Sequence, residues 1–181
     1  NGGFKIINTN LDSAAALVES FKQISVDRIN EQPRAVKLNQ YCQHIVQTLS
    51  PVTKNAKVEL TFICTKEIVF NTYPGLISQV ITNLITNSIK HAFVNQHDRK
   101  IIIALSGGEG KPVTIEYTDN GIGISEDIIA NVMEPFFTTA RNRGGTGLGL
   151  SIVHTCIVEK LNGTIKLTGN EGHGANFVIT I

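Results

Sequence analysis

The chain has 181 residues, of which 41% are hydrophobic, enough for one well-packed domain with an added helix. Its formal net charge is +1 with basic and acidic residues interspersed, which argues against binding nucleic acid or a membrane surface through bulk charge. The three cysteines lie far apart without a metal-ligand spacing, and no run of 18 apolar residues occurs, so a disulfide scaffold and a membrane span within this sequence are excluded.

The first segment of the chain predicts one helix. Residues 10–12 can cap it, and an apolar stripe continues to about Arg28. The sequence Asn-Glu-Gln-Pro at 30–33 then breaks the helix and predicts a hinge. We therefore expect residues 1–34 to form a helix and a hinge, and residues 35–181 to form a separate domain.

The second segment predicts strands and helices that are grouped rather than strictly alternating. After a short strand, Asn39 can cap a helix that Pro51 ends. This grouping favours an α+β fold, a two-layer α/β sandwich in which helices cover one face of a mixed sheet, with a closing hairpin. The predicted strands are residues 35–38, 58–63, 68–70, 101–105, 113–118, 164–167 and 176–181, and the predicted helices are residues 40–50, 74–93, 127–133 and 148–161.

The predicted helix at residues 74–93 has two different sides. The side that we expect to pack on the sheet consists of Ile77, Val80, Ile81, Leu84, Ile85, Ile89 and Ala92. The other side is a polar ridge with spacings of three and four, formed by Gln79, Asn83, Asn87, Lys90 and His91. A ridge of amides and a lysine could also be a solvated surface, so this helix alone leaves its role open.

A carboxylate and two glycines follow the predicted strand at 113–118. Asp119 stands where the strand ends, and Gly121 and Gly123 would let the backbone approach a flat ligand closely. A carboxylate in this place can accept a hydrogen bond from the exocyclic amine of adenine, a donor that guanine lacks at that position. By itself, Asp-Asn-Gly is also a common hairpin turn, so this stretch is ambiguous when taken alone.

The stretch before the last predicted helix is polar and rich in glycine. It starts with Glu-Pro-Phe-Phe-Thr-Thr at 134–139, and Gly-Gly-Thr-Gly-Leu-Gly-Leu at 144–150 leads into the helix. The free N–H groups and the dipole of that helix would attract an anion. No Gly-Lys-Ser or Gly-Lys-Thr follows, so this is not a Walker loop and a cation must come from elsewhere. Lys90, Arg141 and Arg143 are the candidates.

Together, in this order and at these separations, the stretches 74–93, 119–124, 134–139 and 144–150 resemble four boxes of one family. They are similar to the N, G1, F and G2 boxes of the ATP-binding catalytic domain of two-component sensor histidine kinases. The resemblance covers approximately residues 36–181 and is specific, because four independent boxes agree. It implies the Bergerat ATP-binding fold of the GHKL superfamily and transfer of the ATP γ-phosphate to a protein histidine.

The resemblance also implies partners. It identifies residues 1–34 as the second helix of the dimerisation and phosphoacceptor hairpin with its hinge, and residues 35–181 as the catalytic domain. The first helix of that hairpin, which carries the phosphorylated histidine, is missing here. We therefore expect this chain to phosphorylate the hairpin of the same kinase, which would pass phosphate to a response-regulator receiver domain. The intact protein is expected to be a homodimer that places this domain in the cytoplasm, with an inner-membrane anchor left open and no binding of nucleic acid.

The family's nucleotide site is carried over onto the matching residues. Asn87 matches the magnesium residue, and Asp119 matches the residue that reads adenine. Asn83, one turn before Asn87, is expected to support phosphate or a metal-bound water. The catalytic residues that the resemblance implies are Asn83, Lys90, Arg141 and Arg143. The residues that it implies for Mg²⁺ and ATP are Asn83, Asn87, Lys90, His91, Asp119, Gly121, Gly123, Ile124, Phe136, Gly145, Thr146, Gly147, Leu148 and Gly149.

Two positions depart from the family pattern. Ala140 stands where many relatives have a lysine after the paired threonines, and whether Arg141 or Arg143 replaces it is open. His91 occupies a place where the family often has an aromatic ring beside the nucleotide, and a satisfied surface histidine is the alternative.

The residue at position 83 separates two reaction classes. In hydrolytic relatives such as gyrase, the chaperone Hsp90 and MutL, a glutamate one turn before the metal asparagine activates water. The amide of Asn83 has no useful basicity, so phosphoryl transfer to an outside nucleophile is favoured over hydrolysis. The alternatives to the kinase are a hydrolytic ATPase of the same superfamily and a module that senses ATP or acts as a scaffold without transfer.

Overall fold

The computed structural model describes residues 32–138, 146–168 and 172–181 of the chain. Its main strands are β2 (Val58–Ile63), β4 (Arg99–Gly108), β5 (Lys111–Asp119), β6 (Thr164–Thr168) and β7 (Asn176–Thr180). They form one sheet in the order β2-β4-β5-β7-β6. β2 is parallel to β4, and the other three neighbouring pairs are antiparallel, so the sheet is mixed as predicted.

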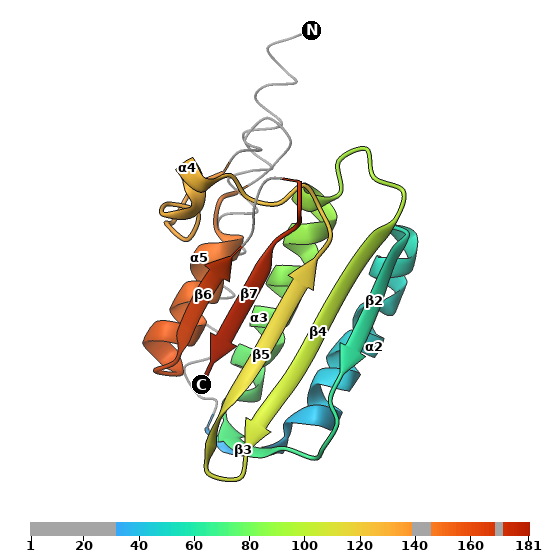
Figure 1. Cartoon of the computed structure of the whole chain (residues 1–181). Helices are drawn as coiled ribbons and strands as arrows, with labels where there is room; N and C mark the ends of the chain where they lie inside the picture. The colour runs from blue at the N-terminus through green and yellow to red at the C-terminus, as the bar shows by residue number, and fades with distance from the viewer. Residues whose placement is uncertain (1–31, 139–145, 169–171) are drawn as a thin grey trace, which may run out of the picture.

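Three helices cover one face of this sheet and lie behind the strands in Figure 1. They are α2 (Leu38–Asn55), α3 (Pro74–Asn87) and α5 (Gly149–His154). α3 continues as the π-helical turn η1 (Ser88–Ala92), α5 continues as the π-helical turn η3 (Thr155–Lys160), and α4 (Glu126–Ile129) is a short helix. This arrangement confirms the predicted α+β fold, a two-layer sandwich with helices on one face.

Buried and exposed side chains alternate along the strands, so one face of the sheet packs on the core and the other faces solvent. In β4, Ile101, Ile103 and Leu105 are buried, whereas the intervening Ile102 is 42% exposed. Burying one such side chain contributes roughly 1.5–3 kcal/mol. The predicted apolar side of α3 faces the same core through Ile77, Val80, Ile81, Leu84 and Ile85.

The prediction for α2 was wrong at both ends. The helix begins at Leu38, so Asn39 lies inside its first turn, and the Oδ1 atom of Asn39 is buried without a hydrogen-bond partner among the described residues. The helix also continues through Pro51 to Asn55. Buried residues on both sides of the proline, from Leu38 to Thr53, keep one face of α2 packed, and this packing outweighs the backbone hydrogen bond that proline removes.

The remaining elements differ from the predictions mainly in their bounds. β1 (Arg34–Lys37) and β3 (Val69–Thr72) pair with each other as a separate antiparallel sheet. α4 ends at Ile129, four residues earlier than expected, and none of its residues is buried. The predicted N-terminal helix and most of its hinge, at residues 1–31, lie outside the described residues.

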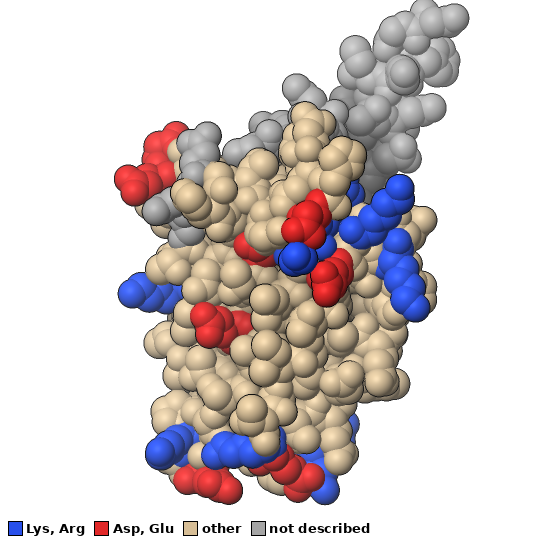
Figure 2. Space-filling view, turned by 45° about the vertical axis from the view of Figure 1, so that its right-hand side comes forward, with Lys and Arg blue, Asp and Glu red and all other residues tan. Residues whose placement is uncertain are grey.

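Charged side chains on the surface are mixed in sign. Figure 2 shows basic and acidic groups side by side toward both ends of the visible face, with mostly uncharged surface between them. The ion pairs found among the described residues are Lys37–Glu67 at 2.9 Å, Lys66–Glu109 at 3.5 Å and Lys100–Asp98 at 3.0 Å. Because these pairs are solvent-exposed, they contribute little to stability. Within the described part of the chain, no helix combines the length and apolar character needed to cross a membrane.

Candidate functional site

Three chain segments that are distant in sequence meet at one end of the sheet in Figure 1. They are the end of α3 with η1, the C-terminal end of β5, and the start of α5. A cavity of about 370 Å³ lies among them, a size typical of small-molecule sites. Residues from all four stretches singled out in the sequence line this cavity, within the ranges 83–92, 119–124, 137–138 and 146–150.

Asp119 is the buried acid of this cavity, with 3% of its surface exposed. Its Oδ2 atom accepts a hydrogen bond from Ser88 Oγ at 2.6 Å, and its Oδ1 atom accepts from the backbone N–H groups of Gly121 and Ala175 at 3.0 and 3.2 Å. Each of these groups is a donor, which suits an acceptor-only carboxylate. A carboxylate can accept about four hydrogen bonds, so Asp119 retains capacity for a donor in the cavity.

A second hydroxyl lies behind Asp119. Tyr117 Oη lies 2.7 Å from Ser88 Oγ and 3.1 Å from Leu84 O, and both oxygens are within reach of its proton. The ring of Tyr117 is buried and packs edge-on against Phe177, with ring centroids 6.1 Å apart. Burial raises the pKa of Tyr117 well above its ordinary value against the opposing effect of the Ser88 hydrogen bond, and the Asp119 charge adds to the rise. Tyr117 therefore stays a neutral hydroxyl at physiological pH.

Two glycines allow close approach of these segments. A Cβ atom on Gly121 would lie 2.4 Å from Ala92 Cβ, and the next N–H, that of Ile122, donates to Ala92 O at 2.9 Å. Gly121 therefore packs the loop after β5 against the end of η1 and does not itself line the cavity. A Cβ atom on Gly149 would lie 2.7 Å from Asn87 Oδ1, so the absence of a side chain leaves room for that amide.

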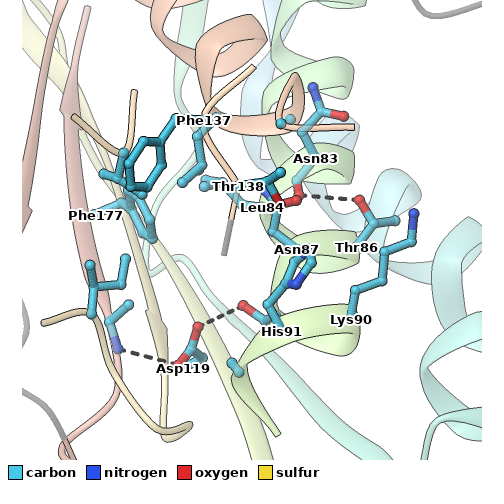
Figure 3. Close-up of a pocket in the computed structure, with 18 of the residues that line it drawn as sticks. Asn83, Leu84, Thr86, Asn87, Lys90, His91, Asp119, Phe137, Thr138 and Phe177 are labelled. Carbon is cyan, nitrogen blue, oxygen red and sulfur yellow. Dashed lines mark hydrogen bonds between the residues drawn. The ribbon is translucent and has the colours of Figure 1, made fainter. Parts of the chain in front are cut away.

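The polar ridge of α3 and η1 borders the cavity. Asn83, Asn87 and His91 line it along the helix, as Figure 3 shows, and Lys90 is exposed at its rim. Gln79, predicted on the same ridge, does not line it. Asn83 Nδ2 is buried and has no hydrogen-bond partner among the described residues, so it is a donor suited to a phosphate oxygen.

The side chains at this end of the cavity suit Mg²⁺ that is bound mainly through phosphate. Among the described residues, no group of three or more His, Cys, Asp or Glu side chains could hold a metal ion. Asn87 offers a neutral amide oxygen, and Mg²⁺ commonly takes one or two protein oxygen ligands together with phosphate oxygens and water. The donor set at Asn87 therefore fits the predicted cation.

The two phenylalanines of the 134–139 stretch lie differently. Phe136, which was predicted to bind nucleotide, is 52% exposed, and its backbone N–H donates to Gly147 O at 2.9 Å. Phe137 lines the cavity instead, together with Thr138, as Figure 3 shows. Two adjacent, identical side chains carry no periodicity, so the sequence has no signal that separates them.

The structure brings most of the predicted site together. The predicted residues that line the cavity are Asn83, Asn87, Lys90, His91, Asp119, Gly123, Ile124, Thr146, Gly147, Leu148 and Gly149. Gly121 and Phe136 do not line it, and Arg141, Arg143 and Gly145 lie outside the described residues. The lining residues that sequence reasoning missed include Thr86, Ser88, Phe137, Ala175 and Phe177. The last two belong to the segment leading into β7 and to β7 itself, which no motif marks.

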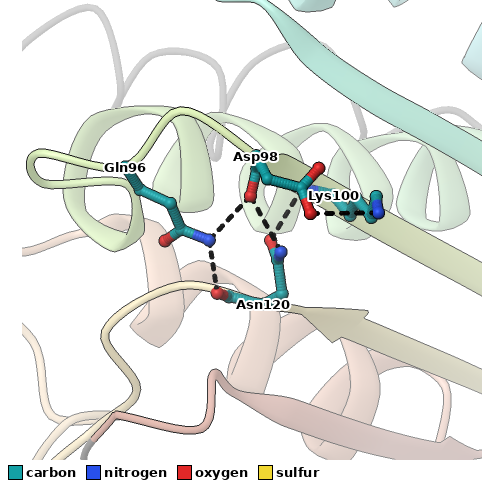
Figure 4. A network of polar contacts seen from close by, with 4 residues as sticks. All are labelled: Gln96, Asp98, Lys100 and Asn120. Carbon is teal, nitrogen blue, oxygen red and sulfur yellow. Dashed lines mark hydrogen bonds and ion pairs between the residues drawn. The ribbon is translucent and has the colours of Figure 1, made fainter.

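A polar network holds the residue that follows Asp119. Asn120 Nδ2 donates to Asp98 O at 2.9 Å, and Asn120 Oδ1 accepts the Lys100 N–H at 2.7 Å. Gln96 Nε2 donates to the carbonyl groups of both Asp98 and Asn120, at 2.7 and 2.8 Å (Figure 4). The Asp98 carboxylate also raises the pKa of Lys100 through a hydrogen bond and its charge. This network joins the loop before β4 to the start of the loop after β5.

Replacing Asn120 with alanine is expected to lower the free energy of unfolding by about 1–2 kcal/mol, because the Lys100 N–H loses its side-chain acceptor and the Asp98 carbonyl loses one of its two side-chain donors. Asp98→Ala is the matched control, since it removes the exposed ion pair but keeps the Asp98 carbonyl in the network. Asp98→Ala is expected to lower the free energy of unfolding by less than Asn120→Ala does. Urea unfolding followed by circular dichroism measures both variants, and equal losses would contradict a special role for Asn120.

Comparisons with known proteins identify the family of this chain. The family model described as "Histidine kinase-, DNA gyrase B-, and HSP90-like ATPase" matches residues 72–181. Sensor histidine kinase ZraS of Escherichia coli K12 is 35% identical over 147 residues, which cover 81% of this chain and 30% of ZraS. Autoinducer 2 sensor kinase/phosphatase LuxQ of Vibrio harveyi is 30% identical over 178 residues, which cover 89% of this chain and 19% of LuxQ. The chain thus spans less than a third of the length of these curated relatives.

Solved structures of histidine kinases have the same fold as this chain. The nucleotide-free catalytic domain of histidine kinase ThkA is 25% identical, with a TM-score of 0.71 over 83% of this chain and 97% of that domain. A ThkA complex with the response regulator protein TrrA has the same fold, with 22% identity and a TM-score of 0.75 over 97% of this chain and 49% of that one. Because the family model covers more than half of the sequence, the chain belongs to the family of histidine kinase-, DNA gyrase B- and HSP90-like ATPases.

Proposed function

We propose that this chain is the ATP-binding catalytic part of a sensor histidine kinase. It binds Mg·ATP in the cavity at the end of α3 and transfers the γ-phosphate to a histidine outside this chain. The observation that carries the proposal is the single cavity that joins the buried Asp119 to the amides of Asn83 and Asn87. The family match and the curated sensor kinases support the same function.

Asp119 selects the nucleotide base. Its carboxylate is fixed by three donors from the protein and presents its remaining acceptor capacity to the cavity. The exocyclic amine of adenine is a donor at the position where guanine carries a carbonyl oxygen. A guanine in the same pose would place two acceptors against each other, and this favours adenine.

The ridge and the glycine-rich turn hold the phosphates. Asn87 holds Mg²⁺ through its amide oxygen, and Asn83 donates from its buried Nδ2 atom to a phosphate oxygen. The bound cation neutralises phosphate charge. Lys90 at the rim adds a positive charge. Arg141 and Arg143 are proposed, from the sequence alone, to contact the γ-phosphate.

The cavity favours transfer over hydrolysis. Among the described residues that line it, Asp119 is the only carboxylate, and Figure 3 shows it well apart from Asn83 at the opposite end. Position 83 carries an amide, which cannot act as a general base for water. ATP bound here therefore keeps its γ-phosphate until an outside nucleophile arrives.

The proposed partners follow from the same function. The phosphoacceptor hairpin of the parent kinase receives the phosphate and passes it to a response regulator, as the existence of a ThkA complex with TrrA supports. The parent kinase acts as a homodimer, and its ATP supply places this domain in the cytoplasm. Residues 1–34 contribute the second hairpin helix and the hinge.

Transfer in trans tests the proposal. The chain is incubated with Mg²⁺, γ-labelled ATP and the phosphoacceptor hairpin of the parent kinase as a separate polypeptide. Acid-labile label on the hairpin is the expected result, and Asn87→Ala is expected to slow its appearance sharply. Phosphate release without hairpin labelling, lost in Asn87→Ala, would support a hydrolytic ATPase instead. ATP binding with neither reaction would leave a sensing or scaffold module.

A further inference from the structure

The hydroxyl groups of Ser88 and Tyr117 lie behind Asp119, and each of them carries one proton. The carboxylate of Asp119 accepts, so the single hydroxyl proton of Ser88 is committed to its Oδ2 atom at 2.6 Å. Tyr117 then directs its own proton to Ser88 Oγ at 2.7 Å or to Leu84 O at 3.1 Å. The direction of the Ser88 hydrogen bond is therefore fixed by proton count and not only by distance.

We propose that Ser88 is a positioning residue that sets the adenine preference of this site by fixing the rotation of the Asp119 carboxylate. This inference rests on the proposed nucleotide-binding function. Gly121 and Ala175 hold Oδ1 through backbone N–H groups, and Ser88 holds Oδ2. With both oxygens held, the plane of the carboxylate is set and its remaining acceptor direction is set with it.

The place of Ser88 in the fold supports this role. Ser88 is the first residue of η1, is 4% exposed and contacts Asp119 through its side chain. Ala92, the last residue of η1, accepts the N–H of Ile122 and packs on Gly121. Both ends of the π-helical turn are therefore joined to the segment that carries Asp119, so the ridge and the carboxylate keep one relative position.

The test compares two nucleotides that differ at one group. Inosine diphosphate carries a carbonyl oxygen where ADP carries the amine. Ser88→Ala is expected to lower ADP affinity about tenfold, because a charge-assisted hydrogen bond is lost and Asp119 can rotate. Affinity for inosine diphosphate is expected to fall less, so the ratio of the two affinities falls. Ser88→Cys, which keeps the volume but donates weakly, is expected to behave like Ser88→Ala.

Two variants make the test specific. Tyr117→Phe leaves the Ser88 proton on Asp119, so most of the preference for ADP is expected to remain. Ser151→Ala removes a similarly buried serine hydroxyl that donates to Leu148 O at the start of α5, and the preference is expected to be unchanged. Isothermal titration calorimetry with both nucleotides measures every affinity.

The outcomes separate the inference from the proposed function. An unaltered chain that does not bind ADP would overturn both. An unaltered chain that prefers ADP, together with a Ser88→Ala variant that keeps the same affinity ratio, would overturn only the role of Ser88. A loss of preference in Tyr117→Phe as large as that in Ser88→Ala would also overturn it, since packing of the buried pair would then explain both results.

Discussion

Asp119→Asn is expected to weaken ADP binding by about 1–3 kcal/mol, or roughly 5- to 150-fold in dissociation constant. The two side chains have nearly the same shape, but asparagine replaces one acceptor oxygen by an NH₂ donor. The backbone N–H groups of Gly121 and Ala175 already point at Oδ1, so the amide NH₂ would take the Oδ2 side. It would then present a donor to the amine of adenine. Calorimetric titration with ADP measures the loss.

Glu116→Gln is the matched control for this change. Glu116 lies on the same strand as Asp119 but is exposed on the open face of the sheet, where it accepts a hydrogen bond from Asn176 Nδ2 at 3.4 Å. The variant makes the same carboxylate-to-amide change away from the cavity, so ADP affinity is expected to equal that of the unaltered chain. A folded Asp119→Asn variant with undiminished ADP affinity would remove Asp119 as the residue that reads adenine.

Gly149→Ala is expected to slow phosphoryl transfer about 10- to 100-fold, because small displacements of a positioning group are costly. The added Cβ atom would lie 2.7 Å from Oδ1 and 2.9 Å from Nδ2 of Asn87. These contacts are too short to persist, and the end of the Asn87 side chain is the part that can move. The amide would therefore turn away from the place where it is proposed to hold Mg²⁺. Labelled ATP and the phosphoacceptor hairpin measure the rate.

Asn87→Ala provides the comparison for Gly149→Ala. Both variants act on one amide, so the double variant is expected to be no slower than Asn87→Ala alone. ADP affinity without Mg²⁺ is expected to change less than the transfer rate in each case. Losses that add in the double variant would contradict the proposed coupling and would show that Gly149 acts separately from Asn87.

The sequence predicted the parts of the site in which local pattern and tertiary packing agree. The period of α3 places its isoleucines and leucines on the sheet, and the same period places Asn83 and Asn87 together on the cavity side. Asp119 was predictable because an alternating strand ends at it, shortly before Gly121 and Gly123. Both arguments use only residues close in sequence.

Other features depend on contacts that no local pattern records. The sequence predicts that a helix begins after Asn39 and ends at Pro51. The burial of residues from Leu38 to Thr53 instead extends α2 across both positions. Ser88 and Phe137 line the cavity although neither belongs to the polar ridge or to the predicted site. The π-helical turn at η1 was also not predicted, because its sequence is compatible with an ordinary helix.

The place of β7 between β5 and the edge strand β6 has a consequence for synthesis on the ribosome. β7 pairs with β5 on one side and β6 on the other, and Ala175 just before it donates to Asp119. A nascent chain that ends before residue 175 leaves β5 with an open edge and Asp119 without one of its backbone donors. The adenine end of the cavity is therefore completed only when the last strand has emerged from the exit tunnel, after α3 and β5 have been made.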